Sequence, residues 1–181
     1  MKRKHLYLIG PGGVGKSTVA PFVARRLNRA LIDLDTEFCR DIGNIGHYIR
    51  EHGYEKYVRE NSRLFNKLLS TQTEPVLFVL SSGFLTTDIA TETMAFNRKQ
   101  VKETGTSILL LPSLVAAKAT KIICTRQMQR GFGLNPTTET AKYLSRINAY
   151  QSLADHQIVS DKNPEEIAQR VCDLLSSIRA T

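Results

Sequence analysis

The chain has 181 residues, the size of one α/β domain, and 41% of them are hydrophobic, so we expect a globular protein with a sizeable core. Its three cysteines are scattered and form no CxxC pair, which argues against a disulfide framework and a zinc site. No run approaches the roughly 20 apolar residues of a membrane span, so we expect a cytoplasmic protein without membrane contact. The net charge of +8 favours anionic partners but does not choose between nucleotides, small carboxylates and nucleic acid.

Apolar runs alternate with longer helical patterns along the chain, which predicts βαβ units and a parallel sheet. The expected strands are 5–9, 30–34, 75–80, 107–111 and 157–159. The expected helices are 16–28, pieces of 35–71 interrupted near Gly43, Gly46 and Gly53, then 87–104, 113–129, 139–153 and a last helix that opens at Pro164. Residues 75–80 (PVLFVL) are apolar throughout, which is typical of a strand buried on both faces.

Residues 10–17 (GPGGVGKS) match the phosphate-binding pattern GxxxxGK[ST] completely, between an expected strand and an expected amphipathic helix. Glycines let backbone N–H groups converge on phosphate oxygens, and the helix N-terminus adds a favourable dipole. Lys16 can reach the β- and γ-phosphates, and Ser17 can ligate Mg²⁺. No NKxD-type guanine-reading segment is present, so ATP is the expected nucleotide. The predicted binding residues of this segment are Gly12, Gly13, Val14, Gly15, Lys16, Ser17 and Thr18.

Two acids, Asp33 and Asp35, stand at the end of the second expected strand. In a strand, residues two apart point to the same face, and the carboxyl ends of parallel strands hold the ligand. Asp33 is therefore a candidate to hold Mg²⁺ through water, and Asp35 a candidate to orient and deprotonate an acceptor hydroxyl. The alternative is that one acid caps the next helix while the other is solvated.

From these motifs onward the chain resembles the shikimate kinase family, whose fold is like that of nucleoside-monophosphate kinases. The resemblance extends over nearly the whole chain and includes looser matches at Arg59 in YVRE, at Ser81-Ser82-Gly83 after PVLFVL, at Arg126 and Arg130 before a Gly-rich loop, and at Arg146 before Tyr150 and Ala154-Asp155. It implies an α/β, three-layer αβα P-loop NTPase fold with a five-stranded parallel sheet, lid and acceptor-binding helical segments, within a single domain of residues 1–181. It also implies transfer of the γ-phosphoryl group from Mg²⁺–ATP to a hydroxyl of shikimate.

The resemblance assigns roles to particular positions. Asp35, Arg59 and Arg146 would hold the acceptor, the two arginines on its carboxylate, and Gly83 would line the acceptor pocket. Arg suits a planar carboxylate because its guanidinium can grip it bidentately. The remaining implied roles are charge neutralisation on the transferring phosphoryl group by Arg130, cover of the adenine by Arg126 and Pro164, acceptor binding within about 35–71, and a lid at about 126–139.

Three departures from the family pattern leave the acceptor open. Ser81-Ser82-Gly83 replaces a glycine triplet, Ser62 replaces a glutamate, and Gly131 follows the lid arginine where a proline is usual. Arg50 and Arg63 are alternatives to Arg59 as the acceptor arginine. A related kinase for a sugar acid such as gluconate, or for a nucleotide, is therefore the first alternative.

The second alternative is a nucleotide-binding switch or a nucleic-acid binder that uses the +8 charge. Against it, the basic residues are dispersed and no aromatic-basic platform is visible in the sequence. We expect a monomer that binds a small hydroxy-carboxylate and no nucleic acid.

Overall fold

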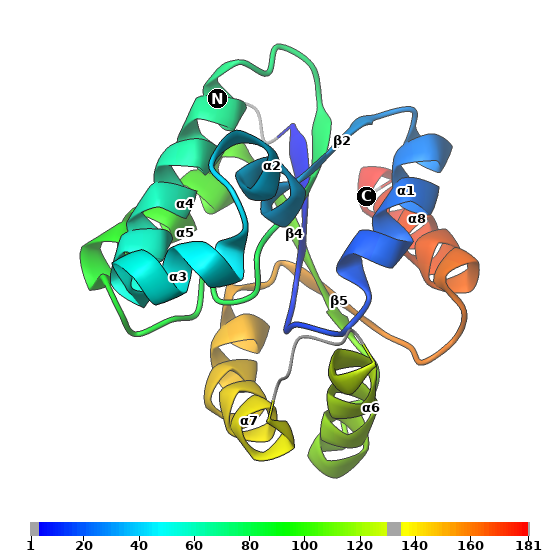
Figure 1. Cartoon of the computed structure of the whole chain (residues 1–181). Helices are drawn as coiled ribbons and strands as arrows, with labels where there is room; N and C mark the ends of the chain where they lie inside the picture. The colour runs from blue at the N-terminus through cyan, green and yellow to red at the C-terminus, as the bar shows by residue number, and fades with distance from the viewer. Residues whose placement is uncertain (1–3, 130–134, 181) are drawn as a thin grey trace.

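Five parallel strands form the centre of the molecule (Figure 1). They are β1 (His5–Ile9), β2 (Ala30–Asp33), β3 (Val76–Val79), β4 (Gly105–Leu111) and β5 (His156–Val159), and they lie in the order β2-β3-β1-β4-β5. Every strand pairing is parallel. The computed structural model describes residues 4–129 and 135–180. The prediction of a five-stranded parallel sheet is confirmed.

Helices cover both faces of this sheet, so the three-layer prediction is confirmed as well (Figure 1). The helices are α1 (Lys16–Leu27), α2 (Leu34–Asp41), α3 (Ile45–His52), α4 (Tyr54–Ser70), α5 (Thr91–Thr104), α6 (Ala116–Met128), α7 (Pro136–Leu153) and α8 (Pro164–Ala180). Figure 1 shows α1 and α8 side by side on one face, and α4 and α5 on the other. The pair α6 and α7 lies at the end of the sheet where β1 ends.

The hydrophobic core has two halves because successive strand residues point to opposite faces. In β1, Leu6 and Leu8 pack with residues of α1 and α8, whereas Tyr7 and Ile9 pack with residues of α2, α4 and α5. All residues of β1 and β3 are buried, as expected for central strands covered by helices on both faces. Because all five strands are parallel, their carboxyl ends lie along one edge of this buried sheet, and the site is built on that edge.

Several expected boundaries differ from the structure by two to four residues, and two of them have clear local reasons. Gly46 does not interrupt a helix, because α3 begins at Ile45 and is capped by Asn44, whose Oδ1 accepts the N–H of His47 at 2.9 Å. The helix expected from residue 87 begins only at Thr91. Residues 82–86 form a turn, and Ala90, directly before the helix, has a left-handed backbone (φ 56°), so the helix cannot start earlier. No helix within the described ranges has the length and apolar character needed to cross a membrane.

Candidate active site

The phosphate-binding loop joins β1 to α1, as the sequence predicts. Gly13 (φ 77°) and Gly15 (φ 99°) lie in the left-handed region that favours glycine. Gly15 is also the N-cap of α1, so the loop delivers the chain directly into the helix N-terminus. The backbone N–H groups of the first helical turn are therefore directed toward the loop, which makes this end of α1 an anion site.

Lys16 is buried beneath this loop, with 8% of its surface exposed. Its Nζ donates to the carbonyl oxygens of Gly10 at 2.7 Å and Pro11 at 3.1 Å. A buried ammonium group needs such partners, since burial of an unpaired charge is costly. The loop thus holds one positive charge at the place where a phosphate chain would bind.

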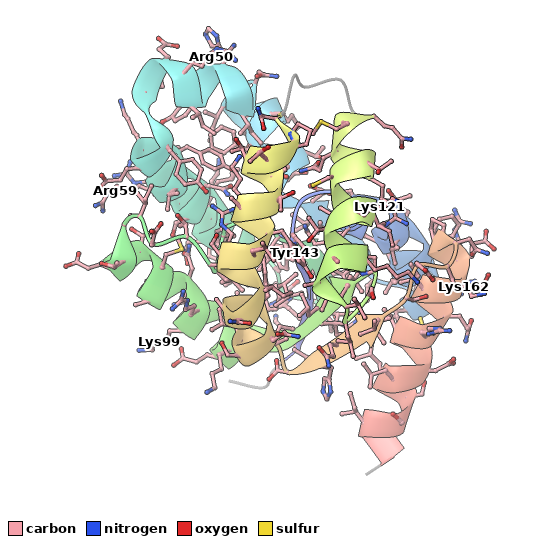
Figure 2. The ribbon with its side chains drawn as sticks, turned by 90° about the horizontal axis from the view of Figure 1, so that it is seen from below. Arg50, Arg59, Lys99, Lys121, Tyr143 and Lys162 are labelled. Carbon is pink, nitrogen blue, oxygen red and sulfur yellow. The ribbon has the colours of Figure 1, made fainter. Side chains whose placement is uncertain are left out.

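A cavity of about 410 Å³ opens at the loop, a size suited to a small-molecule ligand. Every nucleotide-binding residue predicted from the sequence borders it: Gly12, Gly13, Val14, Gly15, Lys16, Ser17, Thr18, Arg126 and Pro164. Asp35, Ser82, Gln127 and Lys162 also border it, and the last two carry no motif by which the sequence could have identified them. Lys162 lies just before α8 (Figure 2).

Helix α6 packs closely against the loop through Gln127. A Cβ atom on Gly12 would lie 2.5 Å from Gln127 Nε2, so a side chain at this position would displace the amide end of Gln127. Gln127 Nε2 also donates to Glu139 Oε2 of α7 at 3.3 Å, and Arg126 Nη1 donates to the Val14 carbonyl at 3.4 Å. The glycine at position 12 therefore leaves the Gln127 amide free to lie against the loop and to bond Glu139.

The two acids after β2 do not share a strand face, and that part of the prediction is wrong. Helix α2 begins at Leu34, and Asp33 is its N-cap: Oδ1 accepts the N–H groups of Asp35 at 3.1 Å and Thr36 at 3.3 Å. A short acceptor before a helix competes well for these otherwise unpaired donors, which is why the strand ends one residue early. Asp35 lies in the first turn of α2 and borders the nucleotide cavity, whereas Asp33 does not.

A second cavity, of about 470 Å³, lies beside the first and draws its walls from several elements. Gly12 and Ser82 border both cavities, so the two meet at this point. The polar residues that border the second cavity are Tyr54 and Tyr57 of α4, Thr87 and Asp88 before α5, and Glu139, Lys142, Tyr143, Arg146 and Tyr150 of α7. Figure 2 shows Tyr143 between α6 and α7.

The turn after β3 is fixed against α7 at this cavity. Gly83 has φ 91°, and its N–H donates to the Tyr150 hydroxyl at 3.1 Å. Burial raises the pKa of Tyr150, so this phenol stays neutral. A Cβ atom on Gly83 would lie 3.0 Å from Nη1 of Arg146, which is one helical turn before Tyr150. Arg146 and Gly83 are thus brought together as predicted, and Tyr150 is the residue that places them.

Tyr57 is positioned by a buried polar network beneath the cavity. Asn61 Nδ2 donates to Ser81 Oγ at 3.0 Å and to the Tyr57 hydroxyl at 3.3 Å. Burial raises the pKa of Tyr57, and the nearby charge of Asp35 raises it further. The Ser81 hydroxyl therefore accepts a structural hydrogen bond, which a glycine at this position could not do. Asp35, which borders the nucleotide cavity, is thus near enough to Tyr57 of the acceptor cavity for its charge to act on that phenol.

The structure does not bring Arg59 to either cavity. Its Nη2 pairs with Glu55 Oε1 at 2.7 Å on the exposed side of α4, and Figure 2 shows it at the outer edge of the molecule. Successive helix residues are rotated by about 100°, so when Tyr57 and Val58 face inward Arg59 faces solvent. The alternatives Arg50 and Arg63 are exposed as well and border neither cavity.

The predicted lid arginine, Arg130, lies outside the described residues, as does Gly131. Its role in charge neutralisation stays a prediction. On the described side of that gap, α6 ends at Met128, two residues after Arg126.

Comparison with known proteins identifies the protein family to which the chain is similar. A family model described as shikimate kinase matches residues 12–176. The chain is 29% identical over 175 residues to a shikimate kinase of Coxiella burnetii (strain Dugway 5J108-111), with 92% of this chain and 90% of that protein covered. It is 34% identical over 83 residues to the pentafunctional AROM polypeptide of Kluyveromyces lactis, which is 45% of this chain but only 5% of the polypeptide's length.

Among solved structures, a shikimate kinase from Acinetobacter baumannii in complex with shikimate superposes with a TM-score of 0.80. The alignment covers 99% of this chain and 97% of that one at 23% identity, which supports a shared fold. The resemblance seen in the sequence motifs is confirmed, because the matched residues 12–176 include residues 12–17 of the loop, both acids and the turn after β3. The chain therefore belongs to the shikimate kinase family.

Proposed function

We propose that the protein transfers the γ-phosphoryl group of ATP to a hydroxyl group of shikimate. The supporting observation is the meeting of two cavities at Gly12 and Ser82, with the phosphate-binding loop on one side and Arg146 on the other. A triphosphate held by the loop would direct its last phosphoryl group toward this junction. A small carboxylate held by Arg146 would bring a hydroxyl to the same point.

The residues in place suit an in-line displacement. The acceptor oxygen forms a bond to the γ-phosphorus while the bond from that phosphorus to the β–γ bridging oxygen breaks, and ADP leaves. Asp35, which borders the nucleotide cavity and whose charge acts on Tyr57 of the acceptor cavity, would orient the hydroxyl and take its proton. Lys16 and the loop N–H groups would neutralise charge on the phosphates, so catalysis comes from positioning and electrostatics.

The residues near the loop also fit Mg²⁺. This ion prefers hydroxyl and carboxylate oxygens, keeps several waters and often binds through one or two carboxylates and the substrate phosphates. Ser17 is exposed at the cavity, and Asp33 would act through water because its Oδ1 already caps α2. When bound, the ion would supply charge neutralisation between the β- and γ-phosphates.

We further propose that Arg126 and Pro164 flank the adenine, since both border the nucleotide cavity. Arg59 could serve as a second acceptor ligand only if α4 rotated about its axis or if the arginine left its ion pair with Glu55. Several expectations stay predictions. These are the single domain of residues 1–181, with an acceptor region near 35–71 and a lid near 126–139, the monomeric state, the cytoplasmic location and the lack of a nucleic-acid partner.

An assay of ADP release coupled to NADH oxidation tests the activity. Purified protein with Mg²⁺–ATP should release ADP when shikimate is present and not without an acceptor. Asp35→Asn should reduce kcat much more than it changes the affinity for ATP, because Asp35 is assigned to the acceptor hydroxyl. Loss of ATP affinity alone in this variant would contradict that assignment.

Gluconate is the second candidate acceptor. Among the described residues, Arg146 is the only arginine that borders the acceptor cavity, while Asp88 and Glu139 could accept hydrogen bonds from the many hydroxyls of a sugar acid. ADP release with gluconate or a nucleoside monophosphate, and none with shikimate, would replace the first assignment. A salt-sensitive shift of an oligonucleotide without any acceptor-dependent turnover would instead indicate a nucleic-acid binder.

A further inference from the structure

Two polar groups from different helices converge above Gly83. A Cβ atom on Gly83 would lie 2.9 Å from the hydroxyl oxygen of Tyr54 and 3.0 Å from Nη1 of Arg146. Tyr54 is the first residue of α4, and Arg146 lies in the middle of α7. The tips of both side chains therefore lie close together beside Gly83, and since both residues also border the acceptor cavity, one group in that cavity could reach both.

Neither group is engaged elsewhere in the part of the chain that the structure describes. No hydrogen bond or ion pair within residues 4–129 and 135–180 involves the Tyr54 hydroxyl or the Arg146 guanidinium. Both residues are partly buried and both border the acceptor cavity. Partly buried polar groups that point at one spot without partners are suited to a ligand, since burial otherwise leaves their hydrogen bonds unmade.

The charge around this spot is small for a site that binds an anion. Lys142, the other cation that borders the cavity in the described ranges, pairs with Glu139 at 2.8 Å. Arg59 pairs with Glu55 on the outer face of α4. Arg146 can form a bidentate pair with a carboxylate, yet a carboxylate has about four acceptor sites, so room for another donor remains.

We propose that Tyr54 is a specificity-determining residue, whose hydroxyl donates a hydrogen bond to the acceptor carboxylate that Arg146 holds in the acceptor cavity. This role rests on the acceptor proposed above. A neutral phenol thus takes the place of a second cation, and the carboxylate is recognised by one charge and one hydroxyl. Tyr57, whose ring centre is 5.8 Å from that of Tyr54, supports the ring from the same helix.

Steady-state kinetics with shikimate and with its methyl ester separate this role from a structural one. The ester removes the carboxylate charge, so the hydroxyl of Tyr54 should matter much less for it. Tyr54→Phe should raise the KM for shikimate by about 10- to 100-fold, the size of one hydrogen bond to a charged group, with little change in kcat. For the methyl ester, the same variant should change kcat/KM by less than about threefold.

Tyr48→Phe is the matched control, because it removes the same atom from a tyrosine that packs against Phe38 and His52 and borders neither cavity. It should alter neither acceptor. A wild-type KM for shikimate in Tyr54→Phe, or an equal loss with acid and ester, would overturn the role of Tyr54 while the kinase activity stands. If the wild-type protein binds Mg²⁺–ATP by calorimetry but releases no ADP with shikimate, the proposed acceptor is wrong and the role of Tyr54 falls with it.

Discussion

Residues 12–18 form much of the nucleotide cavity, whereas the acceptor cavity draws its polar groups from α4, from the turn before α5 and from α7. The nucleotide half centres on one contiguous segment, which offers backbone N–H groups and one lysine to a ligand. The acceptor half depends on side chains that only the folded chain brings together. The comparison teaches that phosphate recognition is fixed by local geometry, while acceptor recognition depends on how each helix is rotated about its axis.

Lys16 offers the most severe test of the nucleotide half. Lys16→Ala should reduce kcat by about 100-fold or more, since it removes the charge that faces the transferring phosphoryl group. The coupled ADP assay measures the loss, and an unchanged thermal midpoint would show that the fold survives. Lys121→Ala, an exposed lysine on α6 (Figure 2), is the control and should leave kcat unchanged. Full activity of Lys16→Ala would remove the basis for the phosphate site.

Arg146 is the corresponding test of the acceptor half. Arg146→Ala should lower kcat/KM for shikimate by about 100-fold, because a carboxylate would lose its charged partner in a partly buried site. The KM for ATP should stay near the wild-type value, since Arg146 borders only the acceptor cavity. Equal losses for both substrates would mean that the two halves are not separate binding regions.

The sequence predicted these halves with unequal success, for physical reasons. The loop pattern specifies backbone shape, so each of its residues lies where expected. Arg59 was expected at the acceptor. The direction of a helical side chain depends on how the helix is rotated about its axis, and in α4 this rotation directs Arg59 to solvent. Asp33 was assigned correctly to the end of β2, but Asp35 lies in the first turn of α2, because the switch from strand to helix at Leu34 ended the two-residue alternation.

Residues that support the site were the hardest to identify from the sequence. Tyr150 reaches Gly83 across 67 positions of the chain, and nothing in its own neighbourhood in the sequence indicates that contact. The i, i+4 spacing of Arg146 and Tyr150 does place both on one face of α7, which was the available signal. Gln127 had no signal at all, because its role follows from the close approach of α6 to Gly12.

Tyr150→Phe sharpens the comparison by removing support without removing a proposed ligand. The variant leaves the buried N–H of Gly83 without its acceptor, so the free energy of unfolding should fall by about 1–3 kcal/mol. Urea unfolding measures this change, with Tyr48→Phe as the matched control. We also expect a higher KM for shikimate and an unchanged KM for ATP. An unaltered urea midpoint would show that the turn does not depend on this hydrogen bond.

The titration of His5 tests whether the free energy of unfolding can change while both halves of the site stay unaltered. It is buried at the start of β1, opposite the cavities, where its Nδ1 accepts the N–H of Val76 at 3.3 Å. Burial, and then the charges of Lys4 and Arg29, lower the pKa of His5 from 6.5 to about 4. The unfolded chain therefore binds a proton more readily than the folded one between these pH values. The free energy of unfolding should fall as pH drops through this window, by up to about 1.4 kcal/mol per pH unit.

Urea midpoints measured from pH 4 to 8 check this dependence. The difference between wild type and His5→Asn should vary only below about pH 6.5 and should be constant above it. The asparagine keeps a side-chain acceptor near Val76 but cannot titrate. A difference that stays constant over the whole range would mean that His5 titrates in the folded protein as it does in the unfolded chain.

Among these variants, Arg59→Ala should have the smallest effect on stability and on the KM for shikimate, in contrast to the large loss expected for Arg146→Ala. The exposed i, i+4 pair with Glu55 should contribute no more than about 0.5 kcal/mol to the free energy of unfolding. Because the guanidinium lies on the outer face of α4, the KM for shikimate should stay within about twofold of the wild-type value. A large rise in that KM would show that α4 rotates, or that Arg59 leaves Glu55, when the acceptor binds. The acceptor half would then be shaped by its ligand, whereas the loop of the nucleotide half already has its binding geometry.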